Sequence, residues 1–398
     1  MAESADRYKR LALATEVFTP GSPIDSLELF SGRMEQVSDI LNAYSAKGQH
    51  VALFGERGVG KTSIANIIAE ALAARPGASR PTSVRVGCTA GDQYHDLWAS
   101  VFKKLGIVQA ADELIQPERI RQVLENLDTP TLIVVDEFDR LSDSETATLF
   151  ADTIKLLSDE PTMATILLVG VADSLDELVT DHKSVGRALR QVQIPRMTTK
   201  ELEGIVEKGG RHIGLKVSAS HRHQIASLSE GLPHYTHALG LYAAQRAIED
   251  DRDVLNDNDI EAAKAIAVRK AQRTIITAYN KATRSAHQDV LFDRVLLACA
   301  LAAKDELGMF AARDVIVPLS MIMGNRYEIP AFARHLKQFS SAERGNILQR
   351  HGEQRRYFYR FDDPMMQPFV ILDGLSKGLI SDDLLEKIKG TVAADRSD

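Results

Sequence analysis

The chain has 398 residues, of which 44% are hydrophobic and 26% are charged, and its formal net charge at pH 7 is −7. This composition is typical of a globular protein of two or three domains and excludes a chain that is disordered throughout. The longest apolar runs fall far short of the roughly 18 residues that a membrane-spanning helix needs, and residues 1–9 are too polar for a signal peptide. We therefore expect a cytoplasmic protein without a membrane partner.

The two cysteines, Cys88 and Cys299, lie far apart in the sequence and in unrelated contexts. Their number and spacing exclude a disulfide framework and a cysteine metal site. We expect both to be buried as small hydrophobic side chains.

The charge is distributed unevenly along the chain. Residues 262–288 carry six cations and no acid, and residues 334–360 carry seven cations against two acids. Subtracting these two segments from the total leaves −18 on the remainder of the chain. An anionic partner is therefore expected to contact the C-terminal half.

Short apolar runs alternate with helical patterns over the first half of the chain. The runs are residues 50–55, 83–88, 131–137, 164–170 and 191–195. They are continuous rather than alternating, as is typical of parallel strands covered on both faces. The pattern predicts an α/β layer with a mainly parallel sheet.

Helical periodicity replaces the strand pattern after Pro195. Four helices are predicted, at residues 198–214, 218–229, 233–250 and 257–283. Thr198 and Ser218 are suited to N-caps, and Gly214 and Gly231 to helix ends. These segments predict a separate helical subdomain.

The last quarter of the chain predicts a third arrangement. Helices are expected at residues 288–303, 311–323 and 329–339, followed by strands at 347–349 and 357–361 that flank a polar turn. Three helices followed by a β-hairpin is the layout of a winged helix. Residues 364–370 form an apolar stretch that is expected to pack in a core or an interface, or to dock a partner.

The segment from Gly55 to Thr62 matches the pattern G-x-x-x-x-G-K-[ST] between a predicted strand and a predicted helix. In such a loop the backbone amides surround phosphates, the lysine reaches the β- and γ-phosphates, and the hydroxyl binds Mg²⁺. The alternative is a glycine-rich turn with an unrelated lysine. The predicted nucleotide-binding residues here are Gly55, Glu56, Arg57, Gly58, Val59, Gly60, Lys61, Thr62 and Ser63.

The strand at 131–137 ends in two adjacent carboxylates, Asp136 and Glu137. At the phosphate edge of a sheet, Asp136 is suited to the Mg²⁺ shell and Glu137 to polarising an attacking water. The alternative is that both only end a strand at the surface. The pair favours hydrolysis over transfer to a metabolite.

The loop 55–62, the Val-Val-Asp-Glu-Phe-Asp stretch at 134–139 and Phe30-Ser31-Gly32-Arg33 together resemble the AAA+ ATPases. The resemblance is to the branch of replication initiators and related STAND signalling ATPases. It implies a parallel sheet in the order 5-1-4-3-2, a helical lid, a winged helix, bound ATP or ADP with Mg²⁺, and homo-oligomers. The implied boundaries are 1–197 for the nucleotide-binding core, 198–284 for the lid, 285–390 for the winged helix and 391–398 for a polar tail.

The resemblance also implies roles for single residues. Asp173 or Ser174 lies where the family has its sensor-1 residue, although an acid such as Asp173 is unusual there. Arg187 and Arg190 lie where relatives supply an arginine finger to a neighbouring subunit, which would make them catalytic together with Lys61 and Glu137. The alternative for both arginines is a solvated surface.

On the adenine side of the site, Gly231-Leu232-Pro233 resembles the G-x-P motif of STAND ATPases. His234 stands where initiators carry a sensor-2 arginine, and Phe18, Pro20 and Arg33 match the segment that lines the adenine pocket. The alternative for Pro233 is a proline in the first turn of a helix.

Cations gather on the predicted third helix and on the hairpin of the winged helix. The predicted DNA contacts are Arg334, Lys337, Arg350, Arg355, Arg356 and Arg360. The sequence thus predicts an ATPase similar to replication initiators or transposition regulators, whose nucleotide state controls assembly and the engagement of duplex DNA. The alternative is a signalling or antiphage-defence switch whose winged helix contacts a protein.

Overall fold

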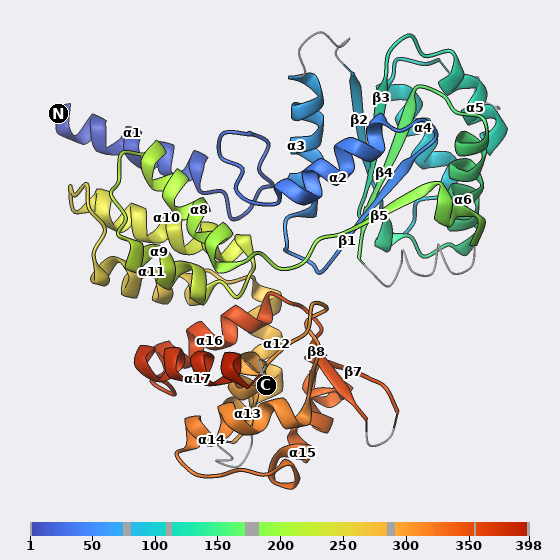
Figure 1. Cartoon of the computed structure of the whole chain (residues 1–398). Coiled ribbons are helices and arrows are strands. Elements are labelled where there is room, and N and C mark those ends of the chain that lie inside the picture. Colours follow the sequence, from blue (N-terminus) through green and yellow to red (C-terminus); the bar gives the residue numbers. More distant parts are fainter. Residues whose placement is uncertain are drawn as a thin grey trace. The chain divides into compact units, whose positions relative to one another are not determined.

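The structure is a computed structural model that describes residues 2–74, 81–108, 114–171, 183–284, 291–353 and 356–395, with residues 2–5, 183 and 184 described by their backbone alone. The chain divides into two compact units (Figure 1). We call Ser22–Pro195 the sheet unit. We call Met1–Gly21 together with Arg196–Asp398 the helical unit.

Five parallel strands form the centre of the sheet unit. They are β1 (His50–Phe54), β2 (Thr82–Gly87), β3 (Thr131–Asp136), β4 (Ala164–Gly170) and β5 (Leu189–Gln193). Their order is β2-β3-β4-β1-β5, which confirms the predicted 5-1-4-3-2 sheet. The fifth strand begins two residues earlier than expected because Leu189 pairs with His50 at the start of β1.

Helices cover both faces of this sheet (Figure 1). α2 (Met34–Ser45) and α3 (Lys61–Ala73) pack on β1, β3, β4 and β5, while α4 (Tyr94–Lys104), α5 (Pro117–Glu125) and α6 (Ser144–Asp159) share a core with the opposite face. Two short 3₁₀ segments, η1 (Phe138–Arg140) and η2 (Lys183–Arg187), follow β3 and precede β5.

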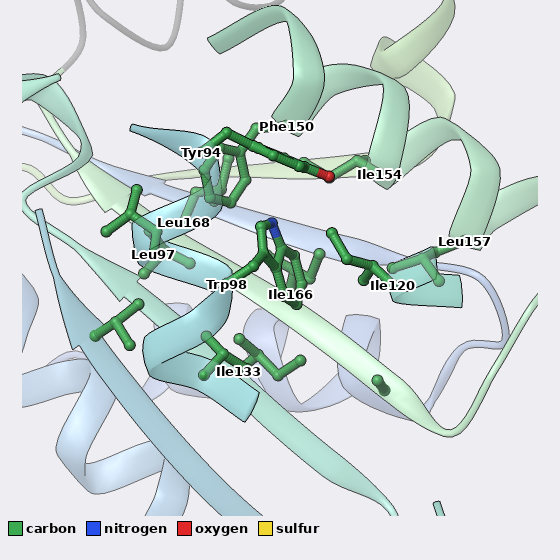
Figure 2. Close-up of a cluster of buried hydrophobic side chains, with 14 of the residues drawn as sticks. Tyr94, Leu97, Trp98, Ile120, Ile133, Phe150, Ile154, Leu157, Ile166 and Leu168 are labelled. Carbon is green, nitrogen blue, oxygen red and sulfur yellow. The ribbon is translucent and has the colours of Figure 1, made fainter. Parts of the chain in front are cut away.

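The core beneath α4, α5 and α6 is built around Trp98 (Figure 2). The Trp98 ring stacks on Phe150, with ring centroids 6.0 Å apart, and Tyr94 meets Phe150 edge to face at 5.4 Å. Side chains from alternate positions of β3 and β4, such as Ile133 and Ile166, complete the cluster on the side of the sheet. This packing fixes the sheet whose strand ends carry the predicted site.

The helical unit begins with a bundle of five helices. They are α1 (Ala2–Val17), α8 (Thr199–His212), α9 (Ala219–Leu228), α10 (Pro233–Glu249) and α11 (Asp257–Arg269). Thr198 and Ser218 cap α8 and α9 through their hydroxyls, as predicted. Because α1 packs on α8 and α10, residues 1–21 belong to this unit rather than to the sheet unit.

The remainder of the helical unit has the elements of a winged helix. Among its described residues, three antiparallel strands in the order β6-β8-β7 accompany six helices and two 3₁₀ segments. These elements are α12 (Arg273–Thr283), α13 (Leu291–Leu301), β6 (Phe310–Ala311), η3 (Ala312–Val315), α14 (Ile316–Met323), α15 (Ile329–Phe339), η4 (Ala342–Arg344), β7 (Leu348–His351), β8 (Phe358–Phe361), α16 (Met366–Ser376) and α17 (Asp382–Ala394).

Three features of the helical unit differ from the expectations or refine them. The helix expected at 257–283 is two helices, because α11 packs on α10 and α16 whereas α12 packs on α13 and α16. The apolar stretch at 364–370 leads into α16 and is largely buried, which is the expected core packing. Residues 391–394 of the expected polar tail are the last turn of α17.

Both cysteines are buried, as expected. Burial raises the pKa of the Cys88 thiol and of the Cys299 thiol to about 12. Among the helices that the structure describes, none has both the length and the apolar composition to cross a membrane.

Candidate functional site

The loop between β1 and α3 depends on glycines for its backbone conformation. Gly58 and Gly60 adopt φ angles of 85° and 95°, which are strained for any residue with a Cβ. Gly55 approaches the backbone of Ile194 so closely that a Cβ would overlap the Ile194 carbonyl oxygen. The loop leads directly into the first turn of α3, whose amide N–H groups have no acceptors within the helix.

Lys61, the first residue of α3, folds back over this loop. Its Nζ donates to the carbonyl oxygens of Gly55 at 2.9 Å and Glu56 at 2.8 Å. Burial lowers the pKa of Lys61, and the nearby carboxylates of Asp139 and Asp136 oppose that shift. An anion beside the ammonium group would favour its charged form further.

Thr62 and Asp136 bring two oxygen donors together at the end of β3. The Thr62 hydroxyl donates to Asp136 Oδ2 at 3.0 Å, and the Glu137 backbone N–H donates to Asp136 Oδ1 at 2.8 Å. The Asp136 side chain is almost completely buried. The structure therefore places the two predicted metal ligands side by side.

Glu137 follows in a left-handed conformation with φ 56°, which is uncommon for a residue other than glycine and is often found at functional sites. Its carboxylate is half-exposed and accepts a hydrogen bond from Arg140 at 2.8 Å. Glu137 is thus held at the end of β3 beside Asp136.

Sequence reasoning missed Arg85, in the middle of β2. Its guanidinium donates to Asp136 Oδ2 and, at 2.9 Å, to Asn66 Oδ1 on α3. The available signal was a single charged residue at the centre of an otherwise uncharged strand. Because Arg85 lies far along the chain from the recognised motifs, the sequence did not link it to them.

The residues present fit a nucleotide with Mg²⁺. At its glycines the loop before α3 has no side chains, and at Gly55 there is no space for one. Exposed backbone N–H groups at a helix N-terminus suit phosphate oxygens. A hydroxyl and a carboxylate are hard oxygen donors of the kind that Mg²⁺ prefers, and Mg²⁺ commonly takes its other ligands from phosphates and water.

The two predicted finger arginines differ in their surroundings. Arg187, the last residue of η2, is exposed and forms no ion pair with a residue that the structure describes. Arg190 lies in β5 and its guanidinium donates to Asp39 on α2 at 3.0 Å. The two candidates for sensor-1, Asp173 and Ser174, lie outside the described residues.

Arg33 is buried in the sheet unit, where its guanidinium donates to the carbonyl of Pro195. It is the N-cap of α2 and has a φ angle of 62°. The structure therefore shows Arg33 holding the chain that leaves β5.

Phe18, Pro20, Pro233 and His234 lie together in the helical unit. Phe18 is buried between α8 and α10, where a Cβ at Gly240 would lie 2.7 Å from its ring. His234 Nδ1 donates to the Pro20 carbonyl at 2.6 Å, and a cavity of about 260 Å³ that includes Tyr242 and Lys270 in its wall adjoins both residues.

Burial lowers the pKa of His234, and the hydrogen bond to Pro20 opposes that shift. A neutral imidazole with its proton on Nδ1 presents only an acceptor at Nε2. That arrangement favours a role in holding Pro20 against α10 over direct contact with a phosphate.

The predicted DNA contacts are exposed to different degrees. Arg334 and Lys337 are exposed on α15, whereas the neighbouring His335 is buried against Phe292. On the hairpin, Arg350 lies over the Tyr357 ring at 4.4 Å, Arg356 is exposed, and Arg360 donates to Gln349 at 2.7 Å. Arg355 lies outside the described residues.

A family model described as "AAA domain" matches residues 45–179, which include the loop, Asp136 and Glu137. The chain contains an AAA domain. This domain is a nucleotide-binding fold, and its matched segment lies entirely within the sheet unit.

Solved structures share the fold around this AAA domain over nearly the full chain. The Walker-type ATPase paby2304 of Pyrococcus abyssi is 16% identical, with 89% of this chain and 99% of that chain covered and a TM-score of 0.53. The Aeropyrum pernix ORC2 protein, solved as ADPNP-ADP complexes, is 15% identical, with 96% and 98% covered and a TM-score of 0.52. The Aeropyrum pernix ORC1 protein, solved in complex with DNA, is 16% identical, with 92% and 97% covered and a TM-score of 0.50. At these identities the likeness concerns the fold.

Proposed function

We propose that this AAA protein binds ATP with Mg²⁺ and hydrolyses it, and that its nucleotide state controls assembly and DNA engagement. The observation that carries the ATPase assignment is the convergence of Lys61, Thr62, Asp136 and Glu137 at one edge of the sheet unit. These residues come from two strand-to-helix connections at the same edge of the sheet, so the fold itself brings them together.

Each of these residues has a distinct task in the proposed reaction. Lys61 exchanges its two carbonyl partners for the β- and γ-phosphates, while Thr62 and Asp136 hold Mg²⁺. When bound, Mg²⁺ neutralises charge that develops on the transferred phosphoryl group. Glu137 orients the attacking water, and for this its carboxylate must leave Arg140.

The experiment that tests the ATPase assignment compares two variants of the full-length protein. Lys61→Ala removes the phosphate contact and should abolish nucleotide binding. Glu137→Gln keeps the shape of the side chain, so ATP should still bind while turnover falls about 100-fold or more. Binding is measured with a fluorescent ATP analogue and turnover by phosphate release. Unchanged turnover in Glu137→Gln removes Glu137 from the catalytic role.

We propose that Pro20, Pro233 and His234 of the helical unit contact adenine and that Phe18 holds their backbone, whereas Arg33 holds the backbone after β5 in the sheet unit. The support is the contact between His234 and Pro20 at the start of α10. The resemblance to STAND ATPases at residues 231–233 points to the same location. The same proposal gives residues 198–284 the role of a lid over the nucleotide and residues 285–390 the role of a winged helix that contacts DNA.

DNA engagement is assigned to α15 and the hairpin of β7 and β8. Arg334, Lys337, Arg350 and Arg356 are exposed cations on these two elements. In a winged helix such positions contact the phosphate backbone and base edges. Among the proteins of similar fold, the Aeropyrum pernix ORC1 protein was solved bound to DNA.

A protein-directed switch is the second candidate, and ion pairs within the helical unit favour it. Lys264 is buried and contacts Asp382 at 2.6 Å, and Lys389 contacts Glu230 at 2.6 Å. These pairs tie α17 to α11 and to the residue that precedes the Gly231-Leu232-Pro233 segment. Such ties would let the nucleotide state control how the winged helix is presented to a partner.

Fluorescence anisotropy with duplex DNA distinguishes the two candidates. The full-length protein is titrated with ATP, ADP or no nucleotide over a series of salt concentrations. Binding that depends on ATP and weakens steeply with salt supports the DNA role, because phosphate contacts release counterions. No binding in any nucleotide state at low salt supports a protein partner.

A further inference from the structure

Arg85 holds an unusual position in the sheet of the AAA domain. Its neighbours Val84 and Val86 point into the core beneath α4, α5 and α6. Because side chains alternate along a strand, Arg85 emerges on the opposite face, which α3 covers. There its guanidinium contacts Asn66 of α3 and Asp136 of β3.

The contact between Arg85 and Asp136 falls on one particular oxygen. Asp136 Oδ2 accepts from both Arg85 and the Thr62 hydroxyl, whereas Oδ1 accepts from the Glu137 N–H. Oδ2 is therefore the oxygen that faces Thr62, the other proposed metal ligand. A guanidinium paired with this oxygen would compete with a divalent cation held by Asp136 and Thr62.

The two partners differ in burial. The Asp136 side chain is 4% exposed and the Arg85 side chain is 40% exposed. A buried carboxylate without a counter-ion is costly, so the pairing stabilises Asp136 when no metal is present. Because Arg85 reaches solvent, its head group can move away without being buried elsewhere.

We propose that Arg85 is a built-in counter-ion of Asp136 that competes with Mg²⁺ for Oδ2. The proposal rests on the nucleotide-binding function proposed above. With Arg85 in place, the site tolerates the phosphates of a nucleotide without metal, because the charge of Asp136 is balanced. When Mg²⁺ binds, Arg85 gives up Oδ2 and keeps its contact with Asn66.

The test is equilibrium binding of a fluorescent ADP analogue to the full-length protein, first in EDTA and then over a MgCl₂ titration. In Arg85→Gln the uncompensated Asp136 repels the phosphates, so affinity in EDTA should fall about tenfold. The loss of the competing cation should also lower the Mg²⁺ midpoint for ADP binding about tenfold. Arg85→Lys keeps the charge and should bind ADP in EDTA within about threefold of the wild type.

The matched control is Arg121→Gln, which removes the same charge from α5. Arg121 is paired with Glu118 and Glu125, and none of its ion pairs with described residues involves Asp136. This variant should leave both the EDTA affinity and the Mg²⁺ midpoint unchanged. Circular dichroism shows whether each variant is folded. If Arg85→Gln is not folded, the ADP affinity of Arg85→Lys in EDTA decides whether the charge of Arg85 is what matters.

Two results would overturn the proposal, and they differ from a failure of the proposed function. If Arg85→Gln weakens ADP binding equally with and without Mg²⁺ and keeps the wild-type midpoint, Arg85 is only a packing residue. If Arg85→Lys loses the EDTA affinity as Arg85→Gln does, the charge of Arg85 is not what balances Asp136. If the wild-type protein binds neither ADP nor ATP at any Mg²⁺ concentration, the nucleotide-binding function itself fails, and the proposal with it.

Discussion

His50 opens β1 with a buried imidazole that the proposed reaction does not use. Its Nδ1 accepts the backbone N–H of Ile166 at 3.0 Å, which joins β1 to the neighbouring strand β4. Burial lowers the pKa of His50 to about 4, from an ordinary value near 6.5. In the folded protein, His50 is therefore neutral near pH 7.

Acid should destabilise the protein through this residue. Below pH 6.5 the unfolded chain binds a proton at His50 that the folded chain does not, so the free energy of unfolding decreases as pH falls from 6.5 toward 4 and is unaffected above that window. The loss from His50 alone amounts to roughly 2 kcal/mol at pH 5. Burial also lowers the pKa of His237 to about 4, which adds to the loss in the helical unit.

The variant His50→Asn tests this prediction. An asparagine oxygen can accept the Ile166 N–H but does not titrate. Urea unfolding at pH 7.5 and pH 5 should show a smaller difference in the variant than in the wild type, and the exposed His95→Asn serves as the control. An equal pH dependence in His50→Asn and the wild type would show that His50 is not the responsible group.

At the scale of elements, α8 and α10 approach each other around Phe18. Both helices place a glycine against the ring, Gly209 on α8 and Gly240 on α10. Glycine usually weakens a helix interior by about 1 kcal/mol, so its presence at both positions reflects the space that the aromatic ring takes. Phe18 thereby attaches the segment after α1 to the helical bundle.

Gly240→Ala should therefore destabilise the helical unit although alanine favours helices. The added methyl group would lie 2.7 Å from the Phe18 ring, and overpacking of this kind costs about 1–3 kcal/mol. The matched control is Gly390→Ala in the exposed part of α17, where a Cβ meets nothing within 4 Å and the change should be neutral or slightly stabilising. Thermal unfolding of the two variants measures the contrast, and equal melting temperatures would contradict the packing argument.

At the scale of the whole molecule, the proposed arginine finger requires that a neighbouring subunit completes the site. Arg187 is exposed at the end of η2, while Arg190 pairs with Asp39 of its own chain. The difference makes Arg187 the better placed of the two to reach a neighbouring subunit. A finger of this kind stabilises charge on the phosphoryl group and is worth about 10³-fold or more in turnover.

Arg187→Ala should lower ATP turnover steeply while leaving the affinity for ATP unchanged, and Arg190→Ala should have a smaller effect. Specific activity of the wild type should rise with protein concentration, because a shared site exists only in the assembled form. Phosphate release over a range of protein concentrations measures both effects. A strictly monomeric protein whose specific activity does not depend on concentration would defeat the finger assignment.

The sequence by itself determined the strands of the sheet unit and the position of the proposed phosphate loop. The continuous apolar runs predicted all five strands, because parallel strands buried on both faces need such runs. The spacing of glycines, lysine and threonine at 55–62 marked the loop, because its chemistry depends on residues that are adjacent in the chain. The winged-helix layout followed from three predicted helices and the hairpin after them for the same local reason.

Only the tertiary structure decided the features that join distant parts of the sequence. It assigned residues 1–21 to the helical unit, divided the helix expected at 257–283, and placed Arg85 on Asp136. Each of these depends on which surfaces meet after folding, and a pattern along the chain does not encode that. Arg85 and Asp136 are 51 residues apart, and the pairing of β2 with β3 is what makes them neighbours.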